Sequence, residues 1–192
     1  MNTPYGRVAL ECLINAFEKY DISNKNVAVI GSETPWIEAV LLNLGNNVTT
    51  VDYNVPKTKY DKLTVIDITK FQASEQEYDC VVTFSSIEHS GLGRYGDTLD
   101  PDGDLKAMLE IHKSLKPSGI CIWGAPVRLD AVVWNAHRVY GHIRLPILFK
   151  GFHEEEFIYP GHTKQSLLSS PPFNASERRS APQPVIVLRK ES

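Results

Sequence analysis

The sequence is poor in the features that mark several classes of protein. Only three of its 192 residues are cysteines, Cys12, Cys80 and Cys121, and none forms a CxxC pair. An odd count in apolar stretches predicts reduced, buried thiols and a cytoplasmic protein. No apolar run approaches the ~20 residues of a membrane-spanning helix. Basic charge is not in excess either, because 20 Lys and Arg against 23 Asp and Glu give a formal charge of −3. We therefore expect neither a nucleic-acid partner nor a membrane partner.

Metal-binding and secretion signals are also missing. The six histidines show no HxH, HExxH or Cys/His pairing, so no metal site is expected. The first twenty residues carry Glu11 and Glu18 within their apolar stretch and lack a cleavage-type site, which argues against a signal peptide. With 42% hydrophobic residues, the chain is able to bury a core. We expect residues 1–192 to form a single domain.

Apolar residues alternate between helical and strand-like spacing along the first two thirds of the chain. Helical spacing predicts helices over residues 9–20, 37–44 and 105–115, with Thr34 as N-cap and Pro35 in the first turn of the second. Short apolar, β-branched runs predict strands over residues 27–31, 48–51, 63–66, 80–84 and 120–124. This alternation predicts an α/β, Rossmann-like fold with a doubly wound, mostly parallel sheet.

The last third follows a different pattern. Residues 131–140 have helical spacing, whereas residues 155–159 and 185–188 resemble strands without a full helix between them. We therefore expect an antiparallel pair that closes the sheet with a C-terminal antiparallel strand. Residues 160–184 hold five of the twelve prolines and are predicted to form a long exposed loop, either mobile or a lid.

Three residues end successive predicted strands. In a doubly wound sheet, ligands bind beyond the carboxyl ends of the strands. Gly31 ends the first strand and allows a ligand close to the backbone. Asp52 ends the second, 21 positions later, where an acid is able to accept both ribose hydroxyls of a nucleoside. Asp67 ends the third. The alternative interpretation is that Gly31 marks only a turn and both aspartates are solvated strand ends.

The fourth predicted strand ends in FSSIEHSGLGRYGD, residues 84–97. Ser85, Glu88 and His89 are placed at the same edge, and histidine titrates near neutral pH. Glu88 and His89 are therefore candidates for a general base or an orienting group. The following glycine-bearing loop provides the candidates for substrate recognition, Arg94, Tyr95 and Asp97. The alternative is that Glu88 or His89 only hydrogen-bonds the loop.

These segments resemble a known superfamily. The stretches VIGSETPWIEAVLLNLG, VTTVDYN, YDCVVTFSSIEHSGLGRYGDTLDPDGD and LEIHKSLKPSGICIWGAPV are similar to class I S-adenosylmethionine-dependent methyltransferases. More narrowly, they resemble the family called domain of unknown function 268, for which SSIEHSGLGRYGD is the specific segment. The resemblance covers roughly residues 8–150 and the closing QPVIVLRK.

The resemblance implies S-adenosylmethionine as cofactor and a methyl acceptor that is either a small molecule or unidentified. Gly31 falls at the glycine of the first methyltransferase motif, Asp52 at the ribose-binding acid and Ser85 at the end of the fourth strand. The implied cofactor-binding set is Gly31, Ser32, Glu33, Asp52, Tyr53, Asp67 and Ser85.

Two other functions stay open. The first motif of the superfamily normally reads GxGxG, whereas this chain has Gly31-Ser32-Glu33-Thr34-Pro35. Loss of these glycines favours a catalytically inactive, methyltransferase-like binding module. An NAD-dependent oxidoreductase is a further alternative. It is disfavoured because GxGxxG is missing and because a terminal antiparallel pair does not suit that fold.

Overall fold

The computed structural model describes residues 5–53, 55, 58–170 and 182–191. The helical elements are α1 (Gly6–Lys19), α2 (Trp36–Asn43), α3 (Ile68–Ala73), the 3₁₀ turn η1 (Ile87–His89), α4 (Gly103–Ser114), α5 (Arg144–Leu148) and α6 (Lys164–Leu168). The strands are β1 (Asn26–Ile30), β2 (Asn47–Val51), β3 (Leu63–Ile66), β4 (Tyr78–Phe84), β5 (Leu115–Gly124), β6 (Ala131–Val133), β7 (His137–Val139), β8 (Phe152–Ile158) and β9 (Val185–Lys190).

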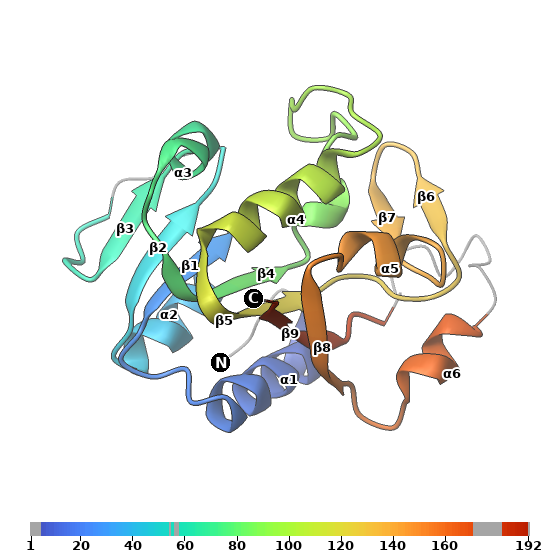
Figure 1. Cartoon of the computed structure of the whole chain (residues 1–192), viewed down its shortest axis with the longest axis horizontal. Coiled ribbons are helices and arrows are strands. Elements are labelled where there is room, and N and C mark those ends of the chain that lie inside the picture. The colour runs from blue at the N-terminus through green and yellow to red at the C-terminus, as the bar shows by residue number, and fades with distance from the viewer. Residues whose placement is uncertain (1–4, 54, 56–57, 171–181, 192) are drawn as a thin grey trace.

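A seven-stranded sheet forms the centre of the molecule (Figure 1), in the order β3-β2-β1-β4-β5-β9-β8. The first five strands of this order pair in parallel, whereas β9 runs antiparallel to both β5 and β8. The predicted mostly parallel sheet with a C-terminal antiparallel strand is therefore confirmed.

Helices cover both faces of this sheet, and the burial of β1 explains its uninterrupted apolar sequence. Val27 and Val29 pack with α1 and α2 on one face, whereas Ala28 and Ile30 pack on the face that carries α3 and α4. All four side chains are buried. A strand enclosed on both sides needs apolar residues at successive positions instead of alternate ones.

Three local predictions were wrong. Residues 131–140 form the β6–β7 hairpin and not a helix, which suits the β-branched valines of AVV and HRV. α2 begins at Trp36, with Pro35 at the N-cap position and no side-chain cap from Thr34. The segment 160–184 contains α6, whose Leu167 and Leu168 join the core, so it is not one exposed loop. Residues 171–181 of that segment lie outside the described residues.

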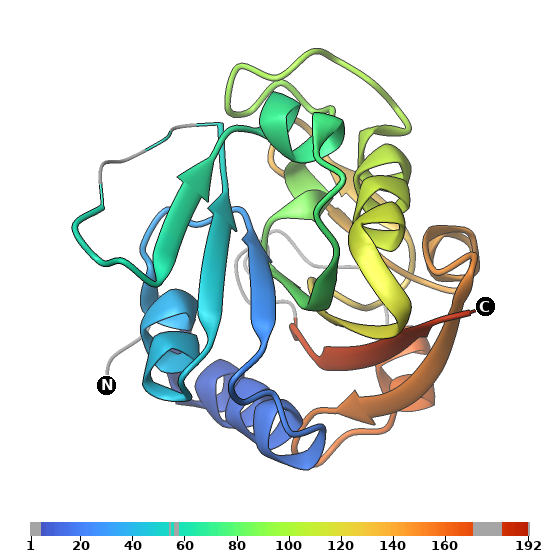
Figure 2. The same cartoon turned by 60° about the vertical axis from the view of Figure 1, so that its left-hand side comes forward.

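The parallel strands bring their carboxyl ends to one edge of the sheet. In Figure 2 the arrowheads of β3, β2 and β1 point to the same side, and the loop after η1 lies over that side. The chain leaves β1 toward β2 in one direction and returns to β4 in the other, so the topological switch point lies between β1 and β4. Among the described residues, no helix is both long and apolar enough to cross a bilayer.

Candidate functional site

A cleft of ≈ 1410 Å³ opens at the carboxyl edge of the sheet, at the switch point. The ends of β1, β2 and β4 form its floor, and the start of α2, the segment 85–100 and faces of α3 and α4 form its walls. Nine of the predicted site residues line it, namely Gly31, Ser32, Glu33, Asp52, Tyr53, Ser85, His89, Tyr95 and Asp97. The fold therefore brings together residues that lie up to 66 positions apart in the sequence, from 31 to 97.

The turn after β1 requires glycine. Gly31 has a φ of +75°, and a Cβ at this position would lie 2.1 Å from the Ser86 hydroxyl oxygen. Its N–H donates to the carbonyl of Val51 (2.9 Å), and the N–H of Ser32 donates to Oδ2 of Asp52 (2.8 Å). These bonds hold the turn after β1 against the end of β2. They give the cleft a floor of close-packed backbone next to a carboxylate.

Ser85 leaves β4 in a strained conformation beside an aromatic cluster. Its φ is +51°, which is uncommon for a residue other than glycine and is found at functional sites more often than elsewhere. Tyr5 also lines this part of the cleft, and its ring packs edge-on against Phe84 at 5.3 Å between centroids. Sequence reasoning missed Tyr5, because it precedes the first helix and only the tertiary fold carries it to β4.

Glu88 lies behind the cleft wall. Its side chain is 1% exposed, and its Oε2 has no hydrogen-bond partner among the described residues. Burial raises its pKa to about 7, because a buried carboxylate loses its hydration, and the nearby Ser85 hydroxyl and backbone N–H groups offset this only in part. Glu88 does not belong to the described lining of the cleft. His89, the next residue in the chain, does line the cleft and is therefore placed to contact a ligand there.

His89 lies in the cleft wall with a defined orientation. Its Nδ1 is 2.5 Å from the carbonyl oxygen of Ala136, and its Nε2 is 3.6 Å from Oε1 of Glu88. Burial lowers the pKa of His89, and the positive charge of Arg94 acts in the same direction. The ring is therefore neutral at neutral pH and able to accept a proton.

The loop after η1 is held by one carboxylate. Asp97 accepts hydrogen bonds from the N–H groups of Gly91 (2.6 Å), Gly93 (3.3 Å) and Tyr95 (3.2 Å). Burial opposes ionisation of Asp97, but these N–H groups outweigh it and lower its pKa. The predicted recognition residue Asp97 thus also orders the loop that presents Tyr95. The guanidinium of Arg94 lies 5.5 Å from the centre of the Tyr95 ring, outside the described cleft lining.

Asp67 lies at the same sheet edge but has a local partner. Its carboxylate caps α3 by accepting the N–H of Lys70 (2.8 Å), and it is not part of the described cleft lining. Side-chain capping of a helix satisfies an N–H group that otherwise has no partner. The structure thus gives Asp67 a structural role instead of contact with the cleft.

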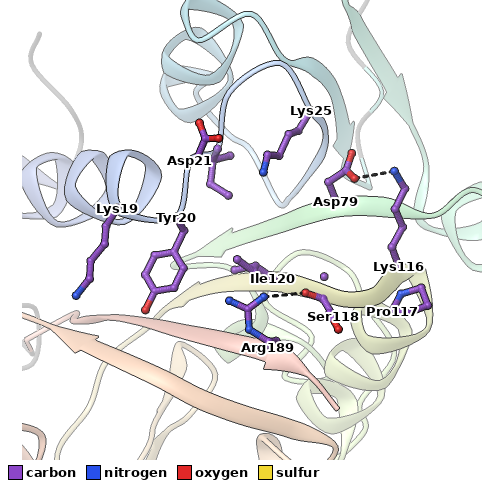
Figure 3. A pocket seen from close by; sticks show the side chains of 12 residues that line it. Lys19, Tyr20, Asp21, Lys25, Asp79, Lys116, Pro117, Ser118, Ile120 and Arg189 are labelled. Carbon is purple, nitrogen blue, oxygen red and sulfur yellow. Dashed lines mark hydrogen bonds and ion pairs between the residues drawn. The ribbon is translucent and has the colours of Figure 1, made fainter. Parts of the chain in front are cut away.

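A second, smaller hollow of ≈ 470 Å³ lies at the opposite edge of the sheet (Figure 3). It carries several basic side chains, but Lys116 pairs with Asp79 at 2.6 Å and Arg189 donates to the Ser118 carbonyl at 3.0 Å. Its charges are largely matched within the protein, which leaves the carboxyl-edge cleft as the candidate site. Within the described residues, no group of three or more His, Cys, Asp or Glu side chains has an arrangement able to hold a metal ion.

One protein-family model matches most of the chain. The family model described as "Caenorhabditis protein of unknown function, DUF268" matches residues 24–191. No curated protein matches the chain significantly.

Several solved structures of similar fold are described as methyltransferases. The 1,6-didemethyltoxoflavin-N1-methyltransferase of Burkholderia thailandensis, with S-adenosylhomocysteine bound, has a TM-score of 0.67 at 14% identity over 93% of this chain and 76% of its own. N-methyltransferase NodS from Bradyrhizobium japonicum WM9, also with S-adenosylhomocysteine, has a TM-score of 0.61 at 12% identity over 100% and 90%. A putative sarcosine dimethylglycine methyltransferase from Galdieria sulphuraria has a TM-score of 0.62 at 13% identity over 94% and 84%. The chain therefore has the class I methyltransferase fold.

Proposed function

The chain belongs to the DUF268 family, and we propose that it is an S-adenosylmethionine-dependent methyltransferase whose cofactor lies in the cleft at the carboxyl edge of the sheet. One observation carries the proposal: the backbone of Gly31 and Ser32 is hydrogen-bonded against the end of β2, with Asp52 beside it in the cleft. Similar structures named above hold S-adenosylhomocysteine, which supports the same class of ligand here.

The residues present suit an adenosyl and methionine group. Asp52 offers a carboxylate for ribose hydroxyls at the end of β2. The amino-terminal end of α2, where Trp36 and Ile37 line the cleft, favours an anionic group such as the methionine carboxylate. Phe71 on α3 and Ile111 on α4 add apolar side chains to the cleft wall, against which an adenine ring is able to pack. The cleft of ≈ 1410 Å³ exceeds the about 300–1,000 Å³ of most single-ligand pockets, which leaves room for a small-molecule acceptor.

When bound, S-adenosylmethionine supplies a methyl group on a sulfonium sulfur, which is reactive toward a nucleophile. The work of the protein is then to hold the acceptor in line, exclude water and take up a proton. His89 lines the cleft, is neutral at neutral pH, and so is the proposed proton acceptor. Tyr95, on the loop held by Asp97, is the proposed contact for the acceptor.

A second candidate, a binding module without catalysis, is favoured by a specific feature of the sequence. Ser32, Glu33 and Pro35 stand where glycines are usual in the first methyltransferase motif, and Glu33 is an exposed carboxylate in the cleft wall. Such a module would keep the cleft and bind a ligand other than the methyl donor.

Calorimetric titration with S-adenosylhomocysteine separates these functions. We expect the wild-type protein to bind it and Asp52→Ala to weaken binding by about 1–3 kcal/mol, the effect of losing a charged hydrogen-bond partner. Asp67→Ala is the matched control, because its carboxylate caps α3 outside the cleft lining, and its affinity should equal that of the wild type.

Three outcomes contradict the proposal. No detectable binding of S-adenosylhomocysteine by the wild type at millimolar ligand favours the binding module, and binding of NADH instead favours an oxidoreductase. Equal weakening by Asp52→Ala and Asp67→Ala would show that ribose recognition is not specific to Asp52.

A further inference from the structure

The β6–β7 hairpin determines how His89 is oriented. Ala136, in the turn of this hairpin, presents its carbonyl oxygen 2.5 Å from Nδ1 of His89. A carbonyl oxygen only accepts, so Nδ1 carries the proton, and in the neutral ring Nε2 is left with a lone pair. The hairpin lies beside η1 and the loop that follows it (Figure 1), although it is 47 residues away along the chain.

Arg138, on β7, fixes the backbone on both sides of His89. Its side chain is 5% exposed, and its Nη1 donates to the carbonyl of Ser90 at 2.6 Å and to that of Glu88 at 3.4 Å. Its Nη2 donates to two further carbonyls, those of residues 100 (3.3 Å) and 101 (3.1 Å), which precede α4. One guanidinium thus joins β7 to the backbone on either side of His89, at residues 88 and 90, and to the backbone before α4, at residues 100 and 101. Only arginine has planar donors in sufficient number for this arrangement.

Arg144 is a neighbouring arginine with a different role. Asp104, fully buried on α4, lies 3.6 Å from Nε of Arg138 and 2.5 Å from Nη2 of Arg144. Arg144 also donates to the carbonyl of residue 101 (2.8 Å). Among the described hydrogen bonds, none joins Arg144 to the backbone of residues 88–90. The two arginines therefore share a carboxylate, but only Arg138 holds the backbone around His89.

We propose that Arg138 is a positioning residue of the acceptor site, which keeps Nδ1 of His89 on the Ala136 carbonyl and so leaves Nε2 as the proton acceptor. The inference rests on the proposed methyltransferase function. In that reaction a lone pair of the acceptor nitrogen or oxygen forms a bond to the methyl carbon, and the carbon–sulfur bond breaks to leave a neutral thioether. The proton lost by the acceptor passes to Nε2, and the imidazolium then releases it to water.

The charged groups around His89 are compatible with this role. Those that face the ring are Glu88 from η1, Arg94, Tyr95 and Asp97 from the following loop, and His137 from β7. Arg94 and His137 lower the pKa of His89 in addition to burial, whereas the Ala136 hydrogen bond and Asp97 raise it. The ring stays neutral at neutral pH, so the position of its single proton is a measurable property.

Nuclear magnetic resonance of protein labelled with ¹⁵N-histidine measures that position directly. Long-range ¹H–¹⁵N correlation distinguishes the protonated from the unprotonated ring nitrogen, and His89→Gln identifies the signals of His89. We expect a single neutral form in the wild type, protonated at Nδ1. Arg138→Met, which keeps the length of the side chain but removes its donors, should give a mixture of both forms. Arg144→Met is the matched control and should retain the wild-type spectrum.

A wild-type ring protonated at Nε2 overturns the inference, and so does an Arg138→Met protein with an unchanged spectrum. Should Arg138→Met fail to fold, Arg138→Lys supplies a single ammonium for four carbonyls, and the same mixture is expected. An unchanged spectrum in that variant counts equally against the inference.

Binding of S-adenosylhomocysteine separates this inference from the proposed function. The folded Arg138 variant should bind it with the affinity of the wild type, because Arg138 contacts the backbone of residues 88, 90, 100 and 101 and is not part of the described cleft lining, whereas Asp52 and Gly31 are. A wild type that does not bind refutes the methyltransferase proposal, whereas the form of the His89 ring is read independently.

Discussion

Replacing Glu88 by glutamine should remove the fall in folding stability that the burial of this carboxyl group causes as pH rises from about 4.5 to about 7. The Glu88 side chain is 1% exposed, and its Oε2 has no hydrogen-bond partner among the described residues. Burial raises its pKa to about 7 from an ordinary value of 4.5, with partial opposition from nearby N–H groups and the Ser85 hydroxyl. Folding therefore favours the protonated carboxyl.

The direction of the effect follows from proton binding by the two states. Between pH 4.5 and about 7 the unfolded chain releases the Glu88 proton while the folded chain retains it. The free energy of unfolding therefore falls as pH rises through this window. A shift from 4.5 to about 7, at about 1.4 kcal/mol for each pKa unit, amounts to a loss of about 3 kcal/mol above pH 7. Glutamine has no such proton, so its variant does not suffer this loss.

Urea denaturation followed by circular dichroism at pH 4 and pH 8 tests this effect. The difference in unfolding free energy between Glu88→Gln and wild type should shift in favour of the variant by about 3 kcal/mol from pH 4 to pH 8. Glu77→Gln, at an exposed position, is the control and should show no such shift. An equal difference at both pH values would refute the reasoning, because it would mean that Glu88 ionises as easily in the folded protein as in the unfolded chain.

Three further predictions concern the turn, the loop and the core. Gly31→Ala should destabilise the protein by about 1–3 kcal/mol more than Gly96→Ala in urea denaturation, the penalty of an overpacked site. Both glycines have positive φ, but only at Gly31 would the new Cβ meet a side-chain oxygen, at 2.1 Å. Asp97→Asn should speed hydrogen exchange of the three amides that it accepts at least about tenfold, because each bond to a charged group contributes about 1.5–3 kcal/mol; unchanged rates would deny it the role of holding the loop. Leu167→Ala should lower the free energy of unfolding by about 2–5 kcal/mol, since this side chain of α6 is 1% exposed, whereas exposed Leu109→Ala should have little effect.

Local sequence patterns predicted the sheet and the polar residues at its carboxyl edge. The run VAVI is apolar at successive positions because β1 is enclosed on both faces, and Gly31 follows it where the backbone turns with positive φ. Asp52 follows β2 for a comparable reason, since an acid after a buried strand lies at the solvent edge of the sheet. These features depend on a few neighbouring residues, so the sequence alone reveals them.

Predictions failed where local spacing had two compatible structures. Residues 131–140 have helical spacing, but their valines also suit strands, and pairing of β6 with β7 decided between the two. The proline-rich composition of residues 160–184 indicated a loop. The structure instead forms α6 within this segment, and Leu167 and Leu168 of that helix pack into the hydrophobic core. In both cases contacts with distant parts of the chain outweighed the local preference.

The sequence by itself determined the five parallel strands, the helices α1, α2 and α4, the glycine turn after β1 and the acidic and polar residues at the carboxyl edge. The tertiary structure alone decided the chemical state of the candidate site. Glu88 is protonated more easily because surrounding elements exclude water from it, and His89 has a defined orientation because Ala136 lies beside it. Asp67 is adjacent to the same edge but caps α3. Burial and hydrogen-bond partners arise between segments that are far apart in the chain, and no local pattern of residues encodes them.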